Sequence, residues 1–180
     1  MKIILTLFIL VTSVFSYCQD TIQSNKLDSL IWEKINQYRE SKGVPVFDSF
    51  EDSLMRQFTR RLASRNLSLY PTKHSDSVGY WCNAECLFTY RCSGDISFKE
   101  KVFDIMNNEF EFLAEKAVNN WINSPTHEQA ISRSSYDVSN VIGLIVIDTT
   151  NKIIRFDATY HALENKKGST SNNYIYKTAN

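Results

Sequence analysis

The feature that most constrains the fold is a pair of strand-like segments late in the chain. Residues 141–147 form an apolar run rich in β-branched side chains, and residues 153–160 alternate between apolar and polar side chains. The residues Asp148 to Asn151 between them are typical of a turn. Two strands joined by so short a connection form a hairpin, and a hairpin belongs to an antiparallel sheet. The C-terminal half of this chain therefore predicts an antiparallel sheet.

Three segments ahead of this hairpin have the apolar spacing of helices. The first runs from Leu27 to a Gly43–Pro45 turn, and the second covers residues 50–65. The third opens with the capping box Ser97–Glu100 and is long, with an expected break near Asn107–Asn108. Helices followed by a hairpin predict an α+β fold rather than a parallel α/β fold.

The first 18 residues are typical of a secretory signal peptide. A charged start at Lys2 precedes a short apolar run, and Ser16 and Cys18 place small residues at the sites that signal peptidase requires. We expect cleavage before Gln19. A lipid anchor on Cys18 is the alternative, which the bulky Tyr17 disfavours. The apolar run is too short to predict a transmembrane span.

We divide the rest of the chain into a polar lead-in at residues 19–26, one domain at residues 27–162 and a polar tail at residues 163–180. Removal of residues 1–18 leaves 19 basic and 20 acidic residues. This balance gives no electrostatic basis for binding nucleic acid or an anionic membrane. The sequence therefore predicts an exported domain whose extracellular ligand or protein partner is unknown.

The exported part contains three cysteines, Cys82, Cys86 and Cys92. In an oxidising compartment they predict one disulfide and one spare thiol, with the pairing left open. A zinc site made by these cysteines and a histidine is an alternative, but their spacing matches no standard zinc finger. All three lie in residues 66–96, which lack sustained periodicity. A loop of that length in a compact domain is usually functional or cross-linked.

Three polar residues from separate segments form the candidate site. His74 lies in the long loop, Glu85 follows it eleven residues later, and His127 lies in the first turn of a predicted helix. Ser124 suits the N-cap of that helix and Pro125 its first position. The positive helix end disfavours a protonated ring, and neutral imidazole is the form that binds a metal or accepts a proton. Two imidazoles and a carboxylate suit a zinc-like divalent ion, or a general base with an orienting acid.

The order of these residues resembles the CAP superfamily, which groups cysteine-rich secretory, antigen 5 and plant pathogenesis-related proteins, and especially its compact bacterial branch. The likeness spans roughly residues 27–160, nearly all of the predicted mature chain. The segments that carry it are Asn36-Gln37-Tyr38-Arg39 with the Gly43-Val44-Pro45 turn, His74 with Ala84-Glu85-Cys86, and Trp121 to His127 ahead of Ile142-Gly143-Leu144.

The resemblance implies a three-layer α-β-α sandwich with a central antiparallel sheet and a surface cleft. In this family two histidines and two acidic residues line the cleft, and the histidine pair can bind a divalent metal. His74, Glu85 and His127 carry over by motif. The second acid has no counterpart, because Ser124 stands in its place. Ala84 and Cys86 also replace the glycine and asparagine that flank the family's acid, so the geometry around Glu85 can differ.

Three functions follow as hypotheses. The leading one is a secreted CAP-like domain whose cleft binds a ligand or partner, with a divalent metal on His74 and His127. The second is an extracellular hydrolase of peptide or cell-wall substrates using Glu85, although the chain has no nucleophile elbow and no H-E-x-x-H motif. The third is an interaction scaffold acting through a disulfide-fixed loop at residues 66–96. We favour binding over catalysis.

Two further assignments concern residues outside the candidate site. Tyr38 and Arg39 are expected to join the first helix to the core or the cleft wall, and we treat them as structural. His161 matches no site residue of the family, and we expect it to be a partly exposed histidine just past the last strand.

Overall fold

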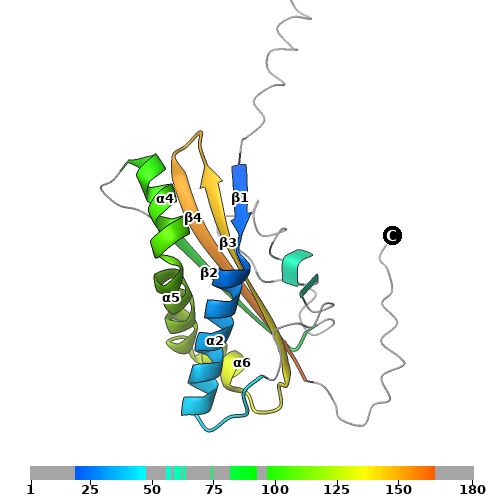
Figure 1. The fold of residues 1–180 in the computed structure, drawn as a ribbon. Coiled ribbons are helices and arrows are strands. Elements are labelled where there is room, and N and C mark those ends of the chain that lie inside the picture. The colour runs from blue at the N-terminus through cyan, green and yellow to red at the C-terminus, as the bar shows by residue number, and fades with distance from the viewer. Residues whose placement is uncertain are drawn as a thin grey trace, which may run out of the picture.

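The computed structural model describes residues 19–47, 56–57, 59–61, 63, 74, 82–92 and 97–164. The predicted signal peptide lies outside the described residues, as do most of the predicted loop at 66–96 and the tail beyond residue 164. The prediction of a loop is wrong for residues 84–92, which form a strand because they pair with a distant strand of the sheet. Figure 1 shows a twisted sheet with helices against one face and a further helical segment on the other side.

A four-stranded antiparallel sheet forms the centre of the molecule. In the order in which they pair, its strands are β1 (Gln19–Gln23), β3 (Val138–Asp148), β4 (Ile153–Leu163) and β2 (Ala84–Cys92). The predicted hairpin is the pair β3 and β4, and it is confirmed together with the α+β class. Strand β1 corrects the prediction of a polar lead-in at residues 19–26. Backbone pairing with β3, which apolar periodicity does not report, makes residues 19–23 a strand.

The continuous helices among the described residues agree with the predicted pattern. They are α2 (Asn25–Ser41), α4 (Phe98–Asn108), α5 (Phe110–Ile122) and α6 (Pro125–Ser132). The expected break falls at Glu109, between α4 and α5. Helix α2 ends at Ser41, and Gly43 just after it has a φ of 67°, which glycine adopts without strain. The capping box of α4 is formed in both directions between Ser97 and Glu100.

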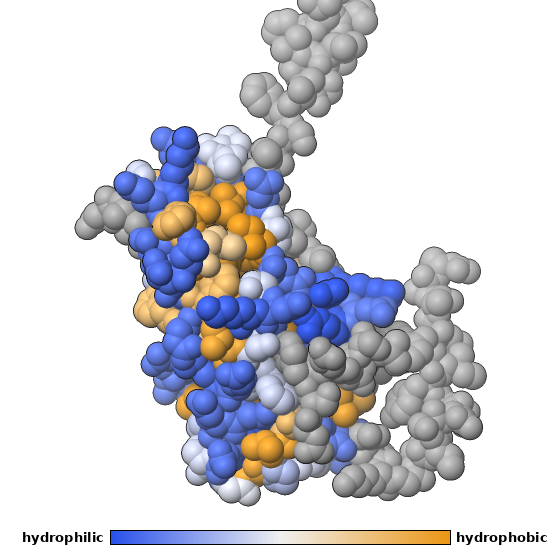
Figure 2. All heavy atoms as spheres, in the orientation of Figure 1, coloured by the Kyte–Doolittle hydropathy of each residue, from blue (hydrophilic) through white to orange (hydrophobic). Residues whose placement is uncertain are grey.

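The two faces of the sheet differ in chemistry. One face is apolar and packs against the helices, with a core that includes Ile31, Leu113, Trp121, Ile145, Phe156 and Tyr160. The other face of β4 carries Arg155, Asp157, Thr159 and His161, and all four are buried. Ala63 packs against Ile142 and Leu144, so the helical residues around position 60 cover this polar face. Figure 2 shows polar side chains over the outer helix surfaces and hydrophobic ones beside α4.

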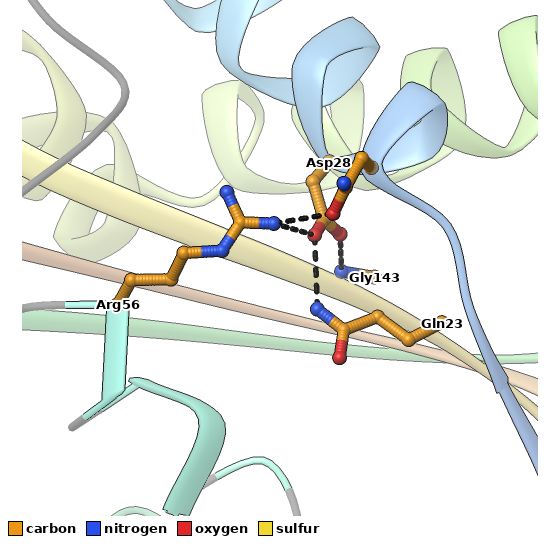
Figure 3. A network of polar contacts seen from close by, with 5 residues as sticks. Gln23, Asp28, Arg56 and Gly143 are labelled. Carbon is orange, nitrogen blue, oxygen red and sulfur yellow. Dashed lines mark hydrogen bonds and ion pairs between the residues drawn. The ribbon is translucent and has the colours of Figure 1, made fainter. Parts of the chain in front are cut away.

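Asp28 fixes helix α2 to the sheet (Figure 3). Its buried carboxylate accepts a hydrogen bond of 2.7 Å from the Gly143 backbone N–H and one of 3.1 Å from the Gln23 side chain. The Arg56 guanidinium lies 3.4 Å from the same carboxylate. Burial raises the pKa of Asp28, while these hydrogen bonds and the nearby arginines act to lower it. One side chain thus links α2 to β1, to β3 and to the segment on the opposite side.

Gly143 lies directly under α2 and has no room for a side chain. A Cβ atom there would lie 3.0 Å from two atoms of the Leu27 side chain and 3.1 Å from Ile31. We expect Gly143→Ala to lower the free energy of unfolding by about 1–3 kcal/mol, because two buried side chains would have to shift. Urea unfolding of the variant and the natural protein measures the difference, and equal midpoints would contradict this packing.

The predicted disulfide is not formed among the described residues, because Cys82, Cys86 and Cys92 are all buried and no two of them are joined. Cys86 and Cys92 lie on one extended strand, where about 3.4 Å per residue separates their Cα atoms by roughly 20 Å, against the roughly 7 Å that a disulfide allows. Burial raises the pKa of the Cys92 thiol to about 11 and raises that of Cys86 further. These cysteines are small core residues, and the hypothesis of a disulfide-fixed loop loses its basis.

Candidate functional site

Glu85 lies at the centre of a hydrogen-bonded row of side chains. It sits on β2 directly opposite His161 of β4, and its side chain is 1% exposed. Its Oε1 is 3.0 Å from Nε2 of His161, and its Oε2 is 2.9 Å from Nδ1 of His74. Nδ1 of His161 is in turn 3.0 Å from the Thr59 hydroxyl oxygen. The row therefore runs from the interior to His74, whose side chain is 57% exposed.

This arrangement determines where His74 carries its proton. A carboxylate only accepts hydrogen bonds, so both histidines must direct an N–H towards Glu85. For His74 that N–H is on Nδ1, which leaves the lone pair of Nε2 free for a metal or a proton. For His161 it is on Nε2, and Nδ1 then accepts the hydrogen bond of Thr59. Glu85 thus acts as the orienting group for the exposed histidine.

His127 stands beside His74, at the beginning of α6. Their ring centroids are 6.0 Å apart and the rings are inclined by 43°. Nδ1 of His127 is buried and has no hydrogen-bond partner within the part of the chain that the structure describes. Burial lowers the pKa of His127, and the neighbouring His74 lowers it further. The lowered pKa keeps the ring neutral near pH 7, as the sequence predicted, but its causes are burial and His74 rather than the helix end.

Ser124 occupies the predicted N-cap position of α6 without the expected contact. Its side chain makes no capping hydrogen bond with the described residues, and its backbone carbonyl accepts the Glu128 N–H at 2.7 Å. The extended backbone of Ser124 still begins the helix, and Pro125 occupies the first position as predicted. His127 is therefore placed by the backbone of α6 rather than by a side-chain cap.

Helix α2 holds both ends of α6 in place. The Tyr38 hydroxyl donates a hydrogen bond of 2.8 Å to Glu128, the residue after His127. Near the other end, the Arg39 guanidinium donates to the backbone carbonyls of Ile131, Arg133 and Tyr136. These contacts agree with the structural role expected for Tyr38 and Arg39. They also make both residues positioning groups for His127.

A hollow of about 620 Å³ is lined by His74 and by Thr126, the residue before His127, and this volume lies in the range of small-molecule sites. Most of its lining residues have polar side chains. They comprise His74, Asn83, Ala84 and Glu85 on one side, and Thr126, Gln129, Ala130, Ser132, Arg133 and Tyr136 from α6 and the turn after it. His74 therefore lines an open space large enough for a ligand.

The prediction for His161 is wrong. It was expected to be a partly exposed histidine just past the last strand, but β4 continues to Leu163 and His161 is fully buried. The signal available in the sequence is that His161 continues the polar side of β4, after Arg155, Asp157 and Thr159. The strand register that sets it opposite Glu85 involves residues far apart in the chain, and local patterns do not encode it.

The row has the side-chain types of a catalytic triad: the Thr59 hydroxyl as nucleophile, the His161 ring as base and the Glu85 carboxylate as acid. Thr59 and His161 are each 0% exposed, however, so a substrate cannot reach the hydroxyl. Their geometry instead holds the Glu85 carboxylate in one orientation. This row is therefore a support for the exposed histidine and not an attacking group.

The histidine pair fits two ligands of a divalent ion. Two imidazoles that share a zinc ion at about 2.1 Å from each nitrogen hold their ring centroids roughly 5–6 Å apart, which is close to the 6.0 Å observed. The unpartnered Nδ1 of His127 is a further donor without a protein contact among the described residues. The described part of the chain contains no cluster of three or more histidine, cysteine or acidic side chains arranged for a metal. The site thus offers two imidazoles and no third close ligand from those residues.

The lowered pKa of His127 predicts a pH dependence of stability. A histidine whose pKa is lower in the folded protein contributes stability above its unfolded pKa, here 6.5, and loses that contribution as the pH falls. We expect His127→Gln to unfold at lower urea concentration than the natural protein near pH 8, and this difference to shrink towards about pH 5. Urea titrations across this range measure it, and a constant difference would show that His127 titrates normally.

Comparisons with known proteins assign no family. No family model matches the chain, and no curated protein sequence matches it. Among solved structures it is similar to an outer surface protein from Borrelia burgdorferi, with 14% sequence identity, a TM-score of 0.48 and coverage of 81% of this chain and 98% of that one. A likeness of that degree assigns neither fold family nor function, so any functional assignment depends on the residues themselves. No helix among the described residues is long and apolar enough to cross a membrane.

Proposed function

We propose that this chain is an exported, CAP-like domain that binds a zinc-like divalent ion on His74 and His127 and uses this cleft to hold an extracellular ligand or partner. The observation that carries the proposal is the pairing of the two rings, 6.0 Å apart, beside the buried Glu85. The signal-like first 18 residues and the order of the motifs support export and the CAP likeness.

Each member of the cleft has a separate task in this proposal. Glu85 keeps the His74 proton on Nδ1, so that Nε2 is free to bind. Burial keeps His127 neutral, and a neutral ring needs no proton loss before it binds a metal. A bound divalent ion would supply a Lewis acid that attracts an oxygen of the ligand. The adjoining hollow of about 620 Å³ provides space for that ligand.

Zinc titration by calorimetry tests the proposal directly. We expect the natural protein to bind one zinc ion, and the double variant His74→Ala, His127→Ala to bind it at least about 100-fold more weakly, because both nitrogen ligands are lost. Gln129→Ala is the matched control, since Gln129 lines the same hollow without an imidazole. Its affinity should equal that of the natural protein.

The decisive outcome is the behaviour of the double variant. Zinc uptake that survives the loss of both imidazoles, with thermal unfolding unchanged, would place the metal elsewhere and remove the proposed function. Affinity lost equally in Gln129→Ala would show a general disturbance of α6 rather than loss of ligands.

A further inference from the structure

A second hollow, of about 470 Å³, lies between helix α5 and strand β2. It shares no lining residue with the histidine cleft. Its β2 side is formed by Phe88 and Tyr90, and its α5 side by Phe112, Lys116 and a group of asparagines. We refer to it as the aromatic groove. Nothing in the candidate metal site requires these residues, so the groove needs an explanation of its own.

Three aromatic side chains that contact one another form the apolar part of the groove. Phe88 and Tyr90 are alternate residues on β2, and their rings are parallel within 6° with centroids 6.5 Å apart. Phe112 meets Tyr90 at 74°, with centroids 6.3 Å apart, and is 45% exposed. A large aromatic side chain left this open to solvent loses the free energy that its burial would provide. Three aromatic side chains that remain partly open to solvent suit a ligand with an apolar face.

The opposite side of the groove is rich in amides. Asn119, Asn120 and Asn123 line it, all three are exposed, and their side chains make no hydrogen bond to any described residue. Asn119 and Asn120 lie inside α5, where each costs about 0.5 kcal/mol of helix propensity relative to alanine and neither serves as a cap. An amide both donates and accepts hydrogen bonds, as hydroxyl groups do. These side chains are therefore placed to bind a ligand rich in hydroxyl or acetamido groups.

The charges in the groove favour a neutral ligand. Glu115 and Lys116 are its only charged lining residues among those that the structure describes, and they have opposite signs. A nucleic acid strand would need several cations along its phosphates, and the mature chain has nearly balanced charge. The Lys116 ammonium lies 4.9 Å from the Tyr90 ring and 5.1 Å from the Phe112 ring. Its flexible stem allows it to leave the rings and donate to a ligand oxygen.

We propose that the aromatic groove binds a short oligosaccharide of neutral pyranose sugars. The C–H face of a sugar ring packs on Phe88 and Tyr90 against the wall of Phe112, while its hydroxyl groups bond to Asn119 and Asn120. The pairing of apolar rings with a few polar groups is the usual composition of a small-molecule site. This inference does not depend on the metal cleft, because the two hollows have no residue in common.

Titration of the purified protein with trisaccharides of glucose, mannose and N-acetylglucosamine, followed by NMR, tests the proposal. We expect at least one of them to bind at millimolar concentration and to shift backbone signals of α5 and β2. Phe112→Ala and Asn120→Ala should each weaken that binding about tenfold. Both side chains are exposed, so thermal unfolding should change little, and Asn120→Ala should even stabilise α5 slightly.

Phe103→Ala is the matched control, because Phe103 is 67% exposed on α4 and does not line the groove. It should leave sugar binding unchanged. Absence of binding by all three trisaccharides would overturn the proposal, as would binding that is equal in Phe112→Ala, Asn120→Ala and the natural protein. A hydrophobic tripeptide that shifts the same signals when no sugar does would assign the groove to peptides instead.

Discussion

Replacing Arg39 with alanine should lower the free energy of unfolding by about 4 kcal/mol, the largest loss expected from a single substitution here. Arg39 is 0% exposed and donates hydrogen bonds to the carbonyls of Pro45, Ile131, Arg133 and Tyr136. Its guanidinium also lies 3.9 Å from the centre of the Phe47 ring. Alanine would leave these carbonyls without their donor and open a cavity beneath α6, which together account for the size of the loss.

Urea unfolding of three variants separates the possible causes. Arg39→Lys keeps the charge but not the planar set of donors, so we expect a loss of about 2 kcal/mol. Arg133→Ala removes an exposed arginine from the same region and should change stability by less than about 0.5 kcal/mol. A loss below about 1 kcal/mol for Arg39→Ala would show that α6 is held by other contacts.

Glu85→Gln should weaken zinc binding about 10- to 100-fold while leaving the fold intact. Gln has nearly the same shape as Glu, but it presents one oxygen and one NH₂ group where the carboxylate presents two oxygens. It cannot accept an N–H from both His74 and His161, so one of the two rings must change its tautomer or lose its hydrogen bond. If His74 changes, its proton moves to Nε2 and blocks the atom that we assign to the metal.

Calorimetry and ¹⁵N NMR of the histidine side chains test this second prediction together. In the natural protein the spectra should show His74 protonated on Nδ1, and in Glu85→Gln either a changed tautomer or exchange between two. The Gln129→Ala control should keep both the tautomer and the zinc affinity. Equal zinc affinity in Glu85→Gln and the natural protein would mean that Glu85 has no part in preparing His74.

The sequence predicted the elements whose pattern is local. The hairpin, the break at Glu109 and the end of α2 just before Gly43 each depend on side chains within a few residues, and the predictions for all three are confirmed. The residues of the candidate cleft were predicted from the order of motifs along the chain. The structure places His74 beside His127 and within hydrogen-bond distance of Glu85. Their role in binding stays a prediction.

The features that the sequence did not predict all depend on distant pairing. Strand β1 forms because β3 supplies hydrogen-bond partners more than a hundred residues later. His161 was expected to be partly exposed because the last strand was predicted to end before it, whereas β4 continues to Leu163 and both of its faces are buried. The three cysteines suggested a cross-link, but extended backbone holds Cys86 and Cys92 apart.

The three cleft side chains are held in place by different kinds of structure. Glu85 stands on a strand paired along its whole length, and His127 stands on a helix clamped by α2. His74 alone belongs to no helix or strand. Glu85 and His127 are thus fixed by the sheet and by α6, while His74 is oriented by its hydrogen bond to Glu85. A substitution at position 74 alone is therefore expected to change which ion or ligand is captured while the domain that presents it stays the same.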